Sequence, residues 1–97
     1  MTDVTAKTIT STGFVTGSAY LAAPARVKGI YYVAAGSAGS IVLKDGGASG
    51  TTLMTIATPA SATATEYIAV PGNGVRFPTD VHATMTNVTS LTVFHDG

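Results

Sequence analysis

The chain contains no cysteine and no tryptophan, and only ten of its 97 residues are charged. Without cysteine, neither a disulfide nor a thiolate metal site can add to the stability of this small protein. The five basic and five acidic residues give zero net charge, which excludes the basic stripe of a nucleic-acid-binding protein. Soluble domains carry roughly 25% charged residues, whereas this chain carries 10%. We therefore expect partner proteins to cover much of its surface, because so few charges give a free monomer little protection against association.

Long hydrophobic runs are also absent. No apolar stretch approaches the roughly 18 residues of a membrane-spanning helix, and the start, MTDVTAKTIT, lacks the basic end and apolar stretch of a signal peptide. We expect a soluble or assembled protein with no membrane partner and no nucleic-acid partner.

The residues that are abundant favour β-structure. Threonine occurs 17 times, alanine 15 times and glycine 11 times. The branched Cβ of threonine suits a pleated strand, and glycine marks turns. No window shows the three-to-four-residue apolar spacing of a helix. The sequence thus predicts an all-β chain, and its length allows one small domain.

Alternating apolar and polar residues, bounded by glycine, proline and asparagine clusters, place the strands. The predicted architecture is a compact antiparallel β-sandwich or small barrel, jelly-roll-like, of seven or eight short strands. Residues 1–22 are predicted to be an extended N-terminal arm or edge strands, and residues 23–97 the sandwich domain. The strand-forming runs are 6–23 (one or two strands), 25–36, 39–45, 51–59, 65–71, 74–86 and 90–96.

The run ARVKGIYYVAAG contains two adjacent tyrosines, Tyr31 and Tyr32. Simple alternation places Val27, Tyr31 and Val33 on one face and Ile30 and Tyr32 on the other. One of the two tyrosines must therefore leave the core and meet solvent, another layer or a partner.

The glycine-rich stretch VLKDGGASGTTLM, residues 42–54, could cradle a phosphate or simply bend the chain. A phosphate loop needs a lysine at a fixed place and a following helix, and both are missing from this stretch. The Asp-Gly pair instead suits a tight hairpin turn, because both residue types tolerate positive φ. The stretch is predicted to be a bend, and so is the stretch that begins at Asn87.

Candidate catalytic residues are few. His82 and His95 lie on predicted strands without the spacing of a metal site, and Asp80 could point to the same side as His82. An Asp–His pair can orient an imidazole, but no activated nucleophile lies nearby in the sequence. We predict no catalytic residue, no cofactor and no metal site, and a small hydrolase is the least favoured of the functions considered.

Residues 26–94 resemble small virion proteins of tailed bacteriophages. The resemblance lies in the strand–glycine turn–strand cadence and in the stretches KDGG and PGNGVRF. It implies a compact β-domain that decorates or cements an icosahedral head, or sits at the tail, and performs no reaction. The implied partner is the major capsid protein, and the implied location is the outer surface of the phage head.

These observations predict a capsid decoration or cement protein that stabilises the head by binding across capsid subunits. It would itself be a homo-oligomer, a trimer or a dimer. The alternative is a tail- or fibre-associated β-module that binds carbohydrate on the host surface. The residues predicted to contact partners are Phe14, Tyr20, Leu21, Arg26, Tyr31, Tyr32, Arg76 and Phe77.

Overall fold

A computed structural model of the chain describes residues 4–61 and 64–96 and contains β-strands joined by turns. The predicted all-β class is confirmed. The described residues form nine strands, one or two more than the sequence predicts: β1 (Thr5–Ile9), β2 (Gly13–Thr16), β3 (Ala25–Ala34), β4 (Gly39–Asp45), β5 (Thr51–Thr58), β6 (Thr65–Ala69), β7 (Val75–Phe77), β8 (Val81–Thr86) and β9 (Val88–Asp96).

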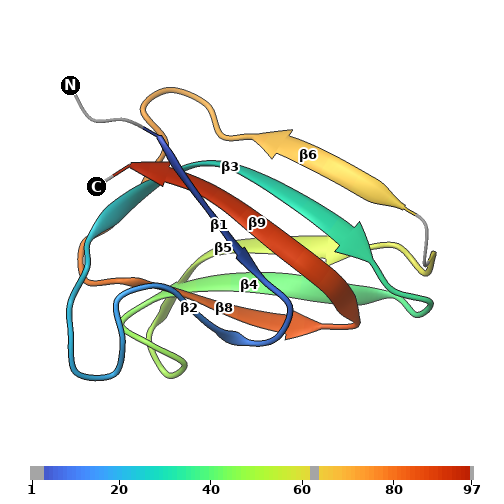
Figure 1. Ribbon diagram of the computed structural model, residues 1–97, viewed down its shortest axis with the longest axis horizontal. Helices are drawn as coiled ribbons and strands as arrows, with labels where there is room; N and C mark the ends of the chain where they lie inside the picture. The colour runs from blue at the N-terminus through green and yellow to red at the C-terminus, as the bar shows by residue number, and fades with distance from the viewer. Residues whose placement is uncertain (1–3, 62–63, 97) are drawn as a thin grey trace.

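The strands form two antiparallel sheets that face each other (Figure 1). The first sheet has the order β1-β9-β3-β6, with β7 also paired to β3, and the second has the order β2-β8-β4-β5. Each sheet has two free edges in this order, so the architecture is the sandwich rather than the closed barrel.

The N-terminal segment supplies one edge strand to each sheet. In the first sheet β1 pairs with β9, and in the second β2 pairs with β8. Val15 on β2 is buried in the common core. Residues 1–3 of the predicted arm lie outside the described residues.

The additional strand arises at Pro78. The strand-forming run 74–86 divides here into β7 of the first sheet and β8 of the second. Proline has no N–H to continue a strand ladder. The two residues that follow instead donate their backbone N–H groups to Oδ1 of Asp45, Thr79 at 2.7 Å and Asp80 at 3.3 Å. The chain therefore changes sheet at this point.

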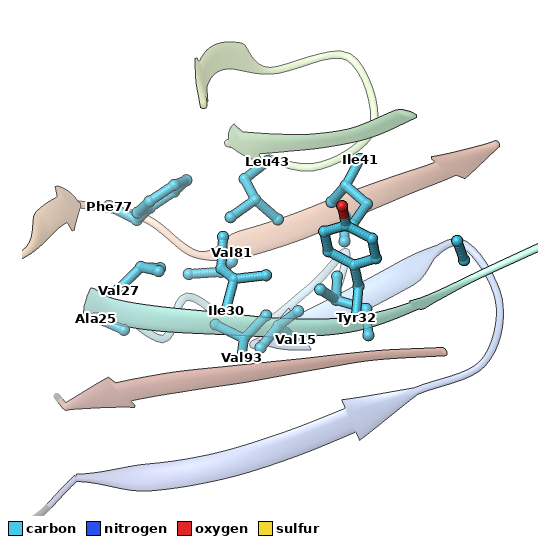
Figure 2. Packing of buried hydrophobic residues seen from close by; sticks show 13 residues of the cluster. Val15, Ala25, Val27, Ile30, Tyr32, Ile41, Leu43, Phe77, Val81 and Val93 are labelled. Atoms are coloured by element: carbon cyan, nitrogen blue, oxygen red, sulfur yellow. The ribbon is translucent and has the colours of Figure 1, made fainter. Parts of the chain in front are cut away.

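The core lies between the two sheets and consists of aliphatic residues with two large aromatic side chains (Figure 2). Tyr32 is 5% exposed, and Phe77 is completely buried beside Leu43 and Val81. The prediction that Tyr32 and Phe77 contact a partner is therefore wrong. Both side chains fill the space between the sheets, so neither has the free surface that binding requires.

A β-bulge in β3 changes which side chains enter the core. Opposite β9, Val27 pairs with His95 and Gly29 with Phe94, so Lys28 is an extra residue. Such an insertion reverses the alternation beyond it. Val27 and Tyr32 are consequently both buried, while Tyr31 is exposed. The predicted grouping of Val27 with Tyr31 is wrong, whereas the prediction that one tyrosine of the pair leaves the core is confirmed.

Candidate functional site

The glycine-rich stretch forms the bend between β4 and β5, as predicted. Gly46 and Gly47 have positive φ angles of 99° and 85°, which a residue with a side chain adopts only with strain. Their two N–H groups both donate to Oδ1 of Asp80, each at 3.1 Å. The loop does gather N–H groups around an anion, but that anion is a carboxylate of the chain itself.

The two loops are held together from both sides. The carboxylate of Asp80 binds the glycine loop, while the carboxylate of Asp45, at the end of β4, binds the backbone of Thr79 and Asp80. We call this pair of carboxylates and their four hydrogen bonds the aspartate clamp. Asp80 is only 4% exposed, so its charge is stabilised by these N–H donors rather than by bulk water. The clamp fixes the position of the bend against the start of β8.

Tyr20 projects from the connection between β2 and β3. Ser18 and Leu21 face each other in an isolated antiparallel bridge, in which each backbone N–H donates to the other residue's carbonyl, at 2.9 and 3.3 Å. The Tyr20 N–H also donates to Oγ of Ser18 at 3.2 Å. This short turn leaves the Tyr20 side chain 99% exposed and Leu21 66% exposed. Two apolar side chains are thus presented to solvent on a hydrogen-bonded turn.

An open groove of about 510 Å³ separates this turn from the glycine loop, and both loops lie at the lower left of Figure 1. We call this space the loop groove. The aspartate clamp forms part of its wall, because Asp80 lines the groove. It is lined by Phe14, Ser18, Ala19, Tyr20, Leu21, Ala22, Gly46, Gly47, Ala48, Ser49, Thr79 and Asp80.

A second exposed surface covers the outer side of the first sheet. Tyr31 on β3 lies directly opposite Tyr67 on β6, and these side chains are 37% and 57% exposed. The Tyr67 ring meets the edge of the Phe94 ring, with centroids 5.9 Å apart and planes at 75°. We call Tyr31, Tyr67 and Phe94 the aromatic face.

The missing side chain of Gly29 leaves room for the Tyr67 ring of the aromatic face. A Cβ atom at this position would come within 2.8 Å of the Tyr67 hydroxyl oxygen and 3.2 Å of its ring carbons. The Tyr67 ring therefore occupies the space over Gly29, on the way to Phe94. This is the arrangement in which an aromatic ring covers a glycine in a neighbouring strand.

Three cations gather at one end of the same outer surface. Arg26 on β3 lies directly opposite Arg76 on β7 on one side and Asp96 on β9 on the other. Nζ of Lys28 lies 3.4 Å from Oδ2 of Asp96 in a partly exposed ion pair. Such a pair adds little stability, but this corner carries three positive charges and one negative charge.

The two histidines occupy separate places. The rings of His82 and Phe14 pack nearly perpendicular to each other, with centroids 4.9 Å apart, and His82 lies opposite Lys44 on β4. Burial and, to a smaller extent, the charge of Lys44 lower the pKa of His82. The charge of Asp80 acts in the opposite direction but does not outweigh them. Burial likewise lowers the pKa of His95, which lies opposite Val27. Among residues 4–61 and 64–96, no group of three or more His, Asp or Glu side chains is placed to hold a metal ion.

The predicted contact residues thus separate into three groups. Phe14, Tyr20 and Leu21 line the loop groove. Arg26, Tyr31 and Arg76 lie on the outer side of the first sheet, while Tyr32 and Phe77 belong to the core.

Sequence reasoning missed the role of Tyr67 and Phe94 on the aromatic face. Alternation in TEYIAVP places Tyr67 and Ile68 on opposite faces of the strand, and Ile68 packs on the core. That alternation was the available signal for Tyr67. Phe94 is found only through its pairing with Gly29 across the β9–β3 ladder.

Comparison with protein-family models, curated proteins and solved structures found no match for this chain. The resemblance to phage virion proteins therefore stands on the quoted stretches of sequence alone. Within the part of the chain that the structure describes, no helix has the length and apolar character needed to cross a bilayer.

Proposed function

We propose that this protein is a structural protein of a phage virion, a decoration or cement protein that binds across capsid subunits on the outer surface of the head. The major capsid protein is its proposed partner. The proposal combines the resemblance of residues 26–94 with a surface that carries few charges. Charged residues are depleted at the centre of protein interfaces, and aromatic residues are enriched there.

The observation that carries the proposal is the Tyr20 turn. Hydrogen bonds already order the backbone of this turn, and the almost completely exposed tyrosine has only two χ angles to fix when it enters a pocket. Tyrosine is among the residues that most often dominate binding energy at interfaces. Tyr20 and Leu21 beside the loop groove are therefore proposed to anchor the protein on the shell.

Co-sedimentation of the purified chain with phage heads and, separately, with tails tests this proposal. Binding to heads is expected, and Tyr20→Ala should weaken it about 30-fold, because an interface hot spot contributes roughly 2 kcal/mol or more. Tyr67→Ala is the matched control, since it removes another exposed tyrosine on a different surface. Equal binding by Tyr20→Ala and the unchanged chain would contradict the proposed anchor, and absence of head binding would contradict the function.

The aromatic face supports a second candidate, a tail- or fibre-associated module that binds carbohydrate. Tyr31 and Tyr67 lie side by side on an exposed sheet surface, and the Thr8 and Thr92 hydroxyls share a hydrogen bond of 2.8 Å in the neighbouring strands. Sugar rings stack on exposed aromatic side chains and bond to nearby hydroxyls. The same two variants separate the candidates on a glycan array. A carbohydrate module would lose binding with Tyr67→Ala and keep it with Tyr20→Ala.

A further inference from the structure

The four free edges of the sandwich differ in how well they are protected against pairing with another strand. A free edge presents unpaired N–H and C=O groups, and proteins commonly protect it with charge, irregularity or short length. In the first sheet, the edge strand β1 carries Lys7, while β6 and the three-residue β7 share the other edge and carry Glu66 and Arg76. In the second sheet, the edge strand β2 has four residues and an irregular register opposite β8.

The remaining edge, β5, has a single irregularity near its start and none of the other protections. It is eight residues long, TTLMTIAT, and contains neither a charged residue nor a proline. Five of its eight residues are exposed, including Leu53 at 39%. Its one irregularity lies near its start, and residues 54–58 pair with β4 in continuous register. Among the described residues, β5 pairs only with β4, so its other side is free along a regular stretch.

We propose that β5 pairs antiparallel with β5 of a second copy of this chain, joining the two second sheets into one sheet of eight strands. This goes beyond the proposed function and does not depend on it. A two-fold axis places the residue on the axis opposite its own copy, and every other residue opposite the one equally far beyond the axis. Lys7, at the middle of β1, would then meet the charge of its own copy, whereas β5 contains no charged residue and meets no like charge in any register.

The pleat restricts the register of this pairing. Met54 and Ile56 both pack on the core, while Thr55 between them points outward. Residues directly opposite each other must lie on the same side of the joined sheet. A register that meets this condition places Thr55 on the two-fold axis, opposite Thr55 of the second copy. Met54 of each copy then lies opposite Ile56 of the other. The apolar side chains then continue the two cores across the interface, and the paired threonines lie on the outer side.

Replacing the residue on the axis tests the pairing. In solution the unchanged protein is expected to have twice the 9.7 kDa mass of one chain, measured by light scattering after size exclusion. Thr55→Lys would place two ammonium groups opposite each other and should weaken self-association roughly 100-fold or more. Thr65→Lys is the matched control, because Thr65 is also an exposed threonine on an edge strand, β6. It should leave the mass at two chains.

Several results would overturn the pairing. These are a mass of one chain for the unchanged protein at its highest soluble concentration, a mass that keeps growing beyond two chains, dissociation by Thr65→Lys, or a dimer that survives Thr55→Lys. If Thr55→Lys does not fold, hydrogen exchange on the unchanged protein decides the question. The amides of residues 51–58 should exchange more slowly as concentration rises, while those of β6 should not change. Equal behaviour of both edges would contradict the proposal.

Discussion

Removing the carboxylate of Asp80 should destabilise the protein far more than an ordinary change in a loop. Asp80 is 4% exposed, and its Oδ1 accepts the N–H groups of Gly46 and Gly47 at 3.1 Å. In Asp80→Ala both donors lose their acceptor, and the glycine loop loses its attachment to the start of β8. Gly46 and Gly47, which have positive φ angles, carry no side chains that could hold the loop in place instead.

The size of the effect follows from these contacts. A hydrogen bond to a charged group contributes about 1.5–3 kcal/mol. Two bonds share one oxygen here, and Gly46 is exposed enough for water to replace its partner. We therefore expect Asp80→Ala to lower the free energy of unfolding by about 3 kcal/mol. For a domain of this size that loss corresponds to a fall in Tm of roughly 12–24 °C.

Urea unfolding at pH 7, followed by circular dichroism, measures this loss. Asp80→Asn keeps an oxygen acceptor without the charge and should cost about half as much. Asp45→Ala removes the other half of the aspartate clamp, and the double variant should cost less than the sum because both carboxylates hold the same two loops. A loss below about 0.5 kcal/mol for Asp80→Ala, the level of an ordinary surface change, would refute the reasoning.

Three further outcomes are expected. Phe77→Ala should cost about 3–5 kcal/mol in urea unfolding, because the ring is completely buried in the core; a stable variant that loses only partner binding would contradict this. Because burial lowers the pKa of His82 and of His95 below 6.5, the unfolded chain binds more protons just below that pH, so stability should fall as pH drops from 6.5. Unfolding at pH 7 and 5.5 checks this, and a His82→Gln/His95→Gln variant that kept the same slope would count against it. Gly29→Ala should displace the Tyr67 ring and shift the NMR signals of its ring protons, with a change in stability of about 1 kcal/mol or less, since the ring is exposed and free to move; unchanged Tyr67 ring signals would contradict the packing over Gly29.

Strand positions and bends followed from local pattern because their causes lie within a few residues. The Asp-Gly pair at Asp45–Gly46 predicted the bend between β4 and β5, and Gly46 has the expected positive φ. Asn87 predicted the bend between β8 and β9, and it too has a positive φ, of 53°. Val81 and Ala83, two residues apart on β8, are both buried, in agreement with the alternation of a strand.

Facing along β3 was not readable in the same way. The extra residue at Lys28 exists only because β3 pairs with β9 in two registers, before and after it. Nothing in ARVKGIYYVAAG itself marks that insertion, apart from the glycine that follows Lys28. The same limit explains Phe77, whose strand is three residues long and was read as part of β8.

The candidate contact residues show this division again. The sequence predicts Tyr20 as a contact residue in the N-terminal arm or edge strands. Its position beside the glycine loop, however, depends on the aspartate clamp, which joins residues more than thirty positions apart. The aromatic face joins Tyr31, Tyr67 and Phe94 from three strands. The alternation along one strand does not show which other strands lie beside it.

By itself, the amino-acid sequence determined the β class, most strand positions, the bends at glycine and asparagine, and the scarcity of surface charge. These depend on backbone preference and composition, which act locally. Only the tertiary structure decided which side of β3 enters the core, which carboxylate fills the glycine loop, and which strand is left as an uncharged free edge. Each of these depends on which distant strand becomes a neighbour, because pairing across a sheet fixes register, burial and the edges that remain.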